Sequence, residues 1–274
     1  MKIRFKTLLA AAAVFAAAGT SVAGFAQDAG KPQGLDVKAF EGLHEDAFKL
    51  TMIQPGRRVV QLIELDAPIS TAKLKELLQR REQIARQYRS EGRARYWKAA
   101  FCGYNFDRVY MMIEFPDVIT MAESWERMNA GPELDRWMDD ARAAGVVFRS
   151  QIFLDTIGGP PLSASNSTAN AAPHVMQIME MNAGFDNNVY LRHEKYMEAL
   201  VNKLKIRRVQ RDYQVNWHGE RPRGQLMMVE YDSVSAMMRG NLVIDNSPEI
   251  KTMLTSGFLG NIQRNSECVT TEIR

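Results

Sequence analysis

Apolar and polar residues alternate along the chain in short blocks, which predict strands and helices in a fixed order. Val59–Ala67 has the alternation of a strand, and apolar residues three or four positions apart predict a helix from Ser70 or Thr71 to about Ser90. Further strands are predicted over 95–103, 108–115 and 146–157, and one helix or two short ones over 119–144, interrupted at Gly131-Pro132. The predicted order is β-α-β-β-α-β.

The second half of the chain repeats this order and parts of the sequence itself. Met111–Phe115 (MMIEF) returns 116 positions later as Met227–Tyr231 (MMVEY), and Val59–Ala67 returns as Val175–Ala183. The predicted elements are strands over 174–183, 210–218, 224–232 and 258–273, and helices over about 186–206 and 233–256. Several matches in one register indicate an internal duplication.

The N-terminal residues have the pattern of a secretory signal peptide. Lys2, Arg4 and Lys6 precede an apolar run, Leu8–Ala18, which is too short to span a bilayer. We predict a signal peptide over 1–26 and a periplasmic or secreted location. The alternative is an uncleaved anchor helix, which a short, alanine-rich run disfavours. No later stretch has the 18 consecutive apolar residues of a membrane span, so no membrane contact is expected of the mature chain.

The rest of the chain divides by composition. We predict a leader and short helix over 27–56, a first unit over 57–157, a linker rich in Gly, Pro, Ser, Asn and Ala over 158–173, and a second unit over 174–274. Removing 1–26 takes away three basic residues and lowers the formal charge from +3 to 0. A neutral mature chain argues against nucleic acid as a partner.

One β-α-β-β-α-β unit leaves a sheet face bare, and two units can bury these faces against each other. At this point the chain resembles the dimeric α+β barrel superfamily, and Ser124–Leu134 (SWERMNAGPEL) resembles its NIPSNAP and antibiotic-biosynthesis-monooxygenase branches. The predicted fold class is therefore α+β, with two tandem ferredoxin-like (βαββαβ) units forming a fused, pseudo-dimeric α+β barrel.

The resemblance implies further features. In the family's barrel, the second strand of one unit pairs with the fourth strand of the other, and these are the strands that hold Cys102 and Cys268. A disulfide between them is therefore expected, with two free buried thiols as the alternative. Relatives also include cofactor-independent monooxygenases, which need an apolar pocket, and haem-binding proteins, for which His193 or His218 would be the axial ligand here.

The alternation within the strands predicts which side chains face the space between the units. Odd positions make the better apolar face, so we expect helices to cover them and the even positions to be enclosed. The enclosed face then carries polar residues, namely Glu64, Lys98, Glu114, Glu180, His218 and Glu230. Buried carboxylates need partners, so this face is a candidate ligand site. The alternative is a structural network in which Lys98, Arg95, Arg211 and water satisfy the glutamates.

The leading functional hypothesis is an exported small-molecule-binding protein. The ligand would lie in the polar interior or between a sheet and its helices, where Trp97 and Trp217 supply apolar walls. A monooxygenase-like enzyme, a haem-binding protein and a purely structural or partner-binding module remain alternatives, and a homo-oligomer is left open. We predict no metal, since no two of the four histidines have a close ligand spacing, and no cofactor. Nucleophile and nucleotide-binding motifs are missing, which excludes the commonest enzyme signatures.

Overall fold

The computed structural model describes residues 56–103, 105–162, 174–182, 187–217, 224–255 and 263–274. The predicted signal peptide, leader helix and most of the linker lie outside these residues, as do His218 and part of the predicted last strand. Side chains are also not described for residues 182, 216, 217, 253–255 and 263–267. The statements that follow concern the described part of the chain.

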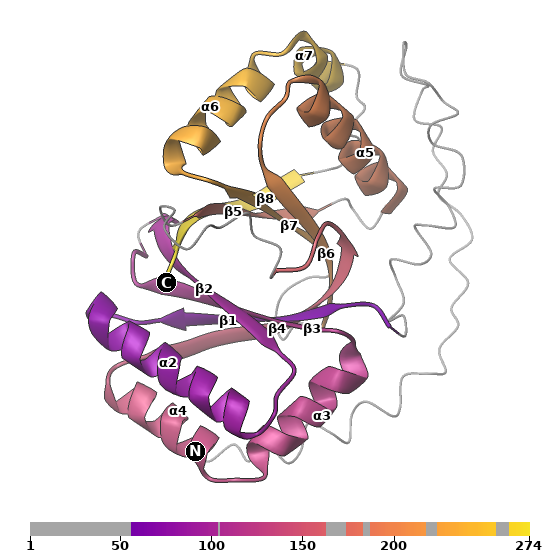
Figure 1. Cartoon of the computed structure of the whole chain (residues 1–274). Coiled ribbons are helices and arrows are strands. Elements are labelled where there is room, and N and C mark those ends of the chain that lie inside the picture. Colours follow the sequence, from indigo (N-terminus) through magenta and orange to yellow (C-terminus); the bar gives the residue numbers. More distant parts are fainter. Residues whose placement is uncertain (1–55, 104, 163–173, 183–186, 218–223, 256–262) are drawn as a thin grey trace. The chain divides into compact units, whose positions relative to one another are not determined.

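Eight antiparallel strands close into a barrel (Figure 1). They are β1 (Val59–Asp66), β2 (Arg93–Phe101), β3 (Arg108–Phe115), β4 (Val147–Gly158), β5 (Val175–Asn182), β6 (Val209–Trp217), β7 (Gln225–Tyr231) and β8 (Gln263–Glu272). The order around the barrel is β1-β3-β2-β8-β5-β7-β6-β4. Closure gives each strand two hydrogen-bonded neighbours, so no sheet edge is left open.

Helices lie on the outside of this barrel. The described helices are α2 (Thr71–Gln87), α3 (Val118–Asn129), α4 (Glu133–Ala143), α5 (Asn187–Lys203), α6 (Val234–Asp245) and α7 (Pro248–Thr255). Ser70, Asp117 and Ser233 cap three of them by accepting a hydrogen bond from a backbone N–H in the first turn. The predicted interruption at Gly131-Pro132 separates α3 from α4.

The strands bury both of their faces. The inner cluster includes Leu62, Met112, Ile178 and Met228, while Leu65, Met111 and other residues pack under the helices of the first half. Even positions face inward on β1, β3, β5 and β7, as expected. The expectation fails on β2 and β6, where Trp97 and Tyr213 are the inward residues. Cross-strand partners share a face, and the register pairs Trp97 with Tyr110 and Tyr213 with Leu226.

The predicted fold class of two tandem ferredoxin-like units is wrong. One continuous barrel runs through the whole described chain, joined by ladders between β2 and β8 and between β4 and β6, and the described residues fall in a single compact unit. The repeat in the sequence predicts local element order, but the pairing of strands far apart in sequence decides that these elements share one sheet. What holds of the resemblance is the coarser statement, a closed antiparallel barrel with helices on its outside.

The predicted disulfide is confirmed. Cys102 and Cys268 are bonded, with their Cα atoms 4.5 Å apart, and no described cysteine is free. The bond joins the end of β2 to β8, next to the ladder that these strands form. It therefore crosses the place where the first and last parts of the described barrel meet.

Candidate functional site

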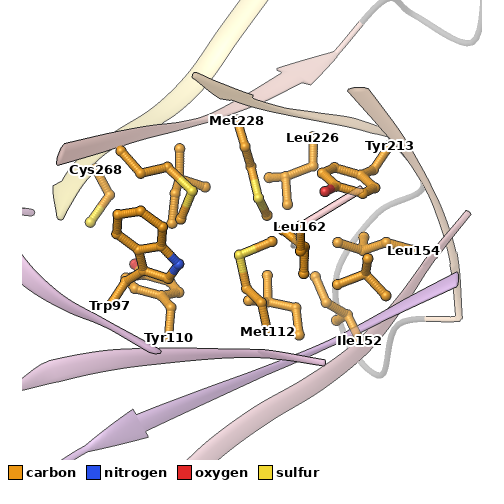
Figure 2. Close-up of a cluster of buried hydrophobic side chains, with 14 of the residues drawn as sticks. Trp97, Tyr110, Met112, Ile152, Leu154, Leu162, Tyr213, Leu226, Met228 and Cys268 are labelled. Atoms are coloured by element: carbon orange, nitrogen blue, oxygen red, sulfur yellow. The ribbon is translucent and has the colours of Figure 1, made fainter. Parts of the chain in front are cut away.

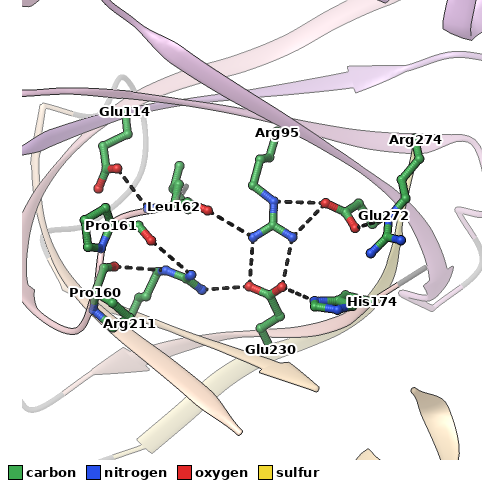
Figure 3. A network of polar contacts seen from close by, with 10 residues as sticks. All are labelled: Arg95, Glu114, Pro160, Pro161, Leu162, His174, Arg211, Glu230, Glu272 and Arg274. Carbon is green, nitrogen blue, oxygen red and sulfur yellow. Dashed lines mark hydrogen bonds and ion pairs between the residues drawn. The ribbon is translucent and has the colours of Figure 1, made fainter. Parts of the chain in front are cut away.

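The inside of the barrel contains a buried ion pair between β2 and β7 (Figure 3). Arg95 donates two hydrogen bonds of 2.8 Å to Glu230, one to each carboxylate oxygen. The Glu230 side chain is 2 % exposed and that of Arg95 is 12 % exposed. This two-point geometry is the strongest form of an arginine–carboxylate contact.

Three more residues complete the network around this pair. Arg211 Nη1 donates to Glu230 Oε2 at 2.9 Å, and His174 Nδ1 contacts Glu230 Oε1. Arg95 also binds Glu272, with Nη2 2.7 Å from Oε1. Burial alone would raise the pKa of Glu230, but hydrogen bonds from Arg95 and His174 and the charges of both arginines lower it to about 2.

The segment that follows β4 enters the barrel and is held by its backbone. We call residues 159–162 the strap. Each strap carbonyl accepts from an arginine. Gly159 accepts from Arg58 at 2.7 Å. Figure 3 shows the other three bonds, from Arg211 to Pro160 and Pro161 at 3.1 and 3.2 Å and from Arg95 to Leu162 at 3.3 Å. The Leu162 N–H donates to Glu114 Oε2 at 2.8 Å.

The strap begins with a glycine that no other residue can replace without strain. Gly159 has φ +90°, and a Cβ at this position would lie 2.3 Å from the backbone oxygen of Gln210. The close approach lets the strap turn from β4 across β6 and into the barrel. Leu162 then reaches the inner cluster with 1 % exposure.

Two polar atoms at the centre of the barrel have no hydrogen-bond partner among the described residues. They are Trp97 Nε1 and the Tyr213 hydroxyl, and both side chains are 0 % exposed. Figure 2 shows both groups pointing toward Met112 and Met228 in the middle of the barrel. A third atom, Glu114 Oε1, likewise accepts no hydrogen bond and has Arg58 Nη1 3.7 Å away. We call the packed region around Trp97, Tyr213, Met112 and Met228 the central chamber.

A second polar cluster lies outside the barrel wall, between α5 and β6. Tyr190 donates to Asp212 Oδ1 at 3.0 Å, and Gln210 Nε2 donates to both Asp212 oxygens at 3.1 Å and to Glu194. His193 Nδ1 lies 2.9 Å from Glu194 Oε1. We call these five residues the α5 cluster.

The two carboxyl groups of the α5 cluster are linked through Gln210, whose Nε2 donates to both of them. Burial raises the pKa of Glu194 to about 7, and burial together with the charge of Glu194 raises that of Asp212. The Glu194 side chain is still 12 % exposed. Two buried carboxyl groups this near each other disfavour double ionisation, so the raised pKa values favour a protonated form of the pair.

The sequence-predicted site residues do not form one cluster. Glu230, Glu114 and Trp97 lie inside the barrel. Glu64 is buried with its Oε2 3.1 Å from Arg108 Nη1, and Glu180 is half-buried on β5. Lys98 faces away from the interior, because it follows the inward Trp97 on β2. The Trp217 side chain and His218 lie outside the described residues.

Sequence reasoning missed Glu272, Glu194 and Asp212, and it counted His174 only among the four histidines without a close ligand spacing. Arg95 and Arg211 entered as partners of a structural network, and they do pair with Glu230. A correct assignment of inward positions on β2 and β6 would have found both arginines, since Arg95 and Arg211 share a face with Trp97 and Tyr213. It would also have placed Asp212 under α5.

The described residues give no support to a metal or a haem. They contain no group of three His, Cys, Asp or Glu side chains placed to hold a metal ion. His193 is 8 % exposed with one nitrogen on Glu194, and a cavity beside His174 measures ≈ 10 Å³, about one water. A cofactor pocket needs several hundred Å³, so this cavity is too small for a haem. No described helix is long and apolar enough to cross a membrane.

Comparisons with known proteins give structural likeness without sequence likeness. Neither a protein-family model nor a curated protein matches the sequence. A mutant chlorite dismutase from Candidatus Nitrospira defluvii is 10% identical over 83% of this chain and 94% of its own, with a TM-score of 0.48. Two further structures are of proteins provisionally described as monooxygenases. The one from Fusobacterium nucleatum is 7% identical over 81% of this chain and 94% of its own, with a TM-score of 0.49. The one from Lactobacillus acidophilus is 12% identical over 79% of this chain and 93% of its own, with a TM-score of 0.46. None of the three supports an activity for this chain.

Proposed function

We propose that this protein binds a small molecule in the central chamber of the barrel. The observation that carries the proposal is the pair of buried, unpartnered polar atoms, Trp97 Nε1 and the Tyr213 hydroxyl, which point at the same apolar space. Leaving a buried donor unsatisfied costs about 1–3 kcal/mol. Two such donors on opposite strands, β2 and β6, are a reason to expect a third group between them.

The chemistry of the chamber limits the ligand class. Trp97 Nε1 can only donate, and burial raises the pKa of Tyr213 above its ordinary value, so its hydroxyl stays protonated and can donate too. Met112, Met176 and Met228 supply adaptable apolar surface in the same cluster. The fitting ligand is therefore compact and mostly apolar, with one or two hydrogen-bond acceptors.

Entry to the chamber requires the strap to move. Among the described members of the inner cluster, Leu162 alone comes from the strap. The others lie on strands, except Cys102, which directly follows β2. It fills apolar space that a ligand would need. The hydrogen bonds that hold the strap come from side chains of Arg58, Arg95, Arg211 and Glu114, and they can break without opening the barrel ladders.

A matched pair of probes tests the chamber. Cyclohexanone carries an acceptor, and methylenecyclohexane has the same shape without it. We expect cyclohexanone to shift the Trp97 indole N–H resonance in the NMR spectrum, methylenecyclohexane to shift it much less, and Trp97→Phe or Tyr213→Phe to weaken cyclohexanone binding. Equal binding of the two probes would refute the site. So would the failure of both probes to bind Leu162→Ala protein, in which the chamber is enlarged.

A second candidate function rests on the α5 cluster. A carboxyl pair that exchanges a proton near neutral pH is the kind of group that could take the proton of a phenolic substrate, with O₂ as the oxidant in a monooxygenase-like reaction. Oxygen uptake with an electron-rich phenol tests it. An enzyme is supported if the native protein consumes oxygen and the folded Glu194→Gln variant does not. If the native protein consumes no oxygen, this reaction is excluded for that substrate.

Location and ancestry also remain proposals. The Cys102–Cys268 disulfide supports export to an oxidising compartment, because such bonds are rare in reducing cytosol. Mass determination of the mature chain from its own cells would test cleavage after residue 26.

The 116-residue repeat supports an origin by tandem duplication, and Ser124–Leu134 supports a relation to the NIPSNAP and antibiotic-biosynthesis-monooxygenase branches.

A further inference from the structure

Helix α6 exposes an apolar stripe on its outer side. Four of the eight large, exposed apolar side chains in the described chain lie on this one helix: Val234 (41 %), Met238 (61 %), Leu242 (64 %) and Val243 (45 %). The first three are spaced four residues apart, so they form one row along the helix. The opposite face is already used, since Met237, Gly240 and Ile244 are buried and α6 packs on β7 and α7.

The internal repeat supplies a comparison for this stripe. At the same offset of 116 residues, the first half has helix α3, where Met238, Leu242 and Val243 correspond to Ala122, Glu126 and Arg127. The first-half helix is thus polar or small at three of the positions where α6 is apolar. Covering the barrel does not require the apolar residues, because α3 covers it without them. A row of exposed apolar side chains of this kind marks a contact surface.

We propose that the α6 stripe pairs with the α6 stripe of a second copy of this chain in an antiparallel, two-fold symmetric contact. In a two-fold contact each patch meets itself. A two-fold axis between Met238 and Leu242 sets Met238 of one copy against Leu242 of the other, twice. Rows with a spacing of four residues interdigitate in the commonest class of helix packing.

Charge at the helix ends favours this arrangement over a parallel one. The last turn of α6 contains Asp245 and no basic residue, so its carboxylate lies at the negative end of its own helix dipole. Antiparallel pairing moves Asp245 of one copy next to Ser235 and the N-terminal turn of the other, where the dipole is positive. The same contact forms twice, and the first turn of α6 carries no acidic residue; Asp232, just before the Ser233 cap, is paired with Arg207 at 3.3 Å.

The size of the stripe sets the strength of the contact. Twelve residues make a helix about 18 Å long, and one such helix covers less than the roughly 800 Å² per partner that stable interfaces bury. The dimer is therefore weak and depends on concentration. Each barrel is already closed on its own, so the second copy is not needed to complete the fold.

Sedimentation velocity of the full mature chain tests the contact, from about 1 µM to about 1 mM, the range of weak complexes. We expect monomer at the low end and dimer at the high end. Met238→Glu and Leu242→Glu should each raise the dissociation constant about tenfold or more, as hot-spot residues do. Ile119→Glu is the matched control, because Ile119 is equally exposed (65 %) on α3, and it should leave the dimer unchanged.

A crosslink identifies what touches the stripe. Because Cys102 and Cys268 are bonded to each other, Leu242→Cys introduces one reactive thiol that can carry a benzophenone label. Adducts to α6 of a second copy support the proposal. Adducts to residues 35–53 of the same chain would overturn it. In sedimentation, the proposal fails if the chain stays monomeric at every concentration, or if Met238→Glu and Leu242→Glu leave the dimer intact.

Discussion

Arg95 and Glu230 are 135 positions apart in the sequence and meet inside the barrel through two hydrogen bonds of 2.8 Å. Arg95 lies on β2 and Glu230 on β7, so the pair joins the first and second halves of the chain across the interior. Arg211 shares the same carboxylate at 2.9 Å. Glu230 is thus the one described acidic side chain that neutralises both of these buried arginines at hydrogen-bond distance.

Glu230→Gln should destabilise the protein strongly. Losing one partner of a buried pair leaves charge uncompensated and costs about 3–5 kcal/mol, and here two arginines lose their common carboxylate. Urea unfolding should show this loss of unfolding free energy. The control is Glu76→Gln, which breaks the exposed 2.9 Å pair with Lys73 and should cost less than about 1 kcal/mol. Equal effects of the two substitutions would contradict the role given to the network.

Glu230 also predicts acid sensitivity. Its folded pKa of about 2 lies below the ordinary 4.5, so the folded state favours the ionised form. The stability it contributes is present above about pH 4.5 and is lost as the pH falls toward 2. Unfolding free energies measured between pH 5 and pH 2 should fall in the native protein and fall less in Glu230→Gln protein.

Glu194 predicts the opposite dependence at higher pH. Its folded pKa of about 7 lies above 4.5, so folding favours the protonated carboxyl. This contribution is complete below about pH 4.5 and is lost as the pH rises through 7, by about 1–3 kcal/mol. Glu194→Gln, which mimics the neutral form, should flatten the unfolding free energy between pH 5 and pH 8. An unchanged slope in this variant would show that the α5 cluster does not favour a protonated Glu194.

The disulfide should contribute substantially to stability. Cys102 and Cys268 are 166 positions apart, and the chain-entropy model gives roughly 4–5 kcal/mol for closing so long a loop. The Cys102→Ser, Cys268→Ser double variant should unfold at markedly lower urea concentration. Thiol titration in denaturant should find no free thiol without reductant and both thiols after reduction; two free thiols in freshly isolated protein would contradict the bond.

The sequence predicted most elements because their signals are local. Ser70 caps α2, Gly131-Pro132 separates α3 from α4, and the strand predicted from Val59 onward is β1 (Val59–Asp66). The closed sheet was not predictable in this way. Its decisive ladders, such as Trp97 with Glu272 and Phe153 with Trp217, join residues far apart in sequence, and no local pattern specifies their register.

The candidate site was predicted in part for the same reason. Alternation shows that Trp97 and Lys98 lie on opposite faces of β2, but it does not show which face is inside. That choice follows from the pairing of Trp97 with Tyr110. The strap was outside sequence reasoning altogether, since Gly159-Pro160-Pro161-Leu162 has the composition of a linker, and its role depends on arginines from three different parts of the chain.

Native mass spectrometry of the protein purified from its own cells tests most directly whether the barrel holds a ligand. We expect the native chain to carry a compact organic molecule, and the Trp97→Phe, Tyr213→Phe double variant to be isolated as the bare chain with its fold intact. A native chain that carries no added mass, or a double variant that carries the same molecule at the same occupancy, would contradict a binding chamber between these two side chains.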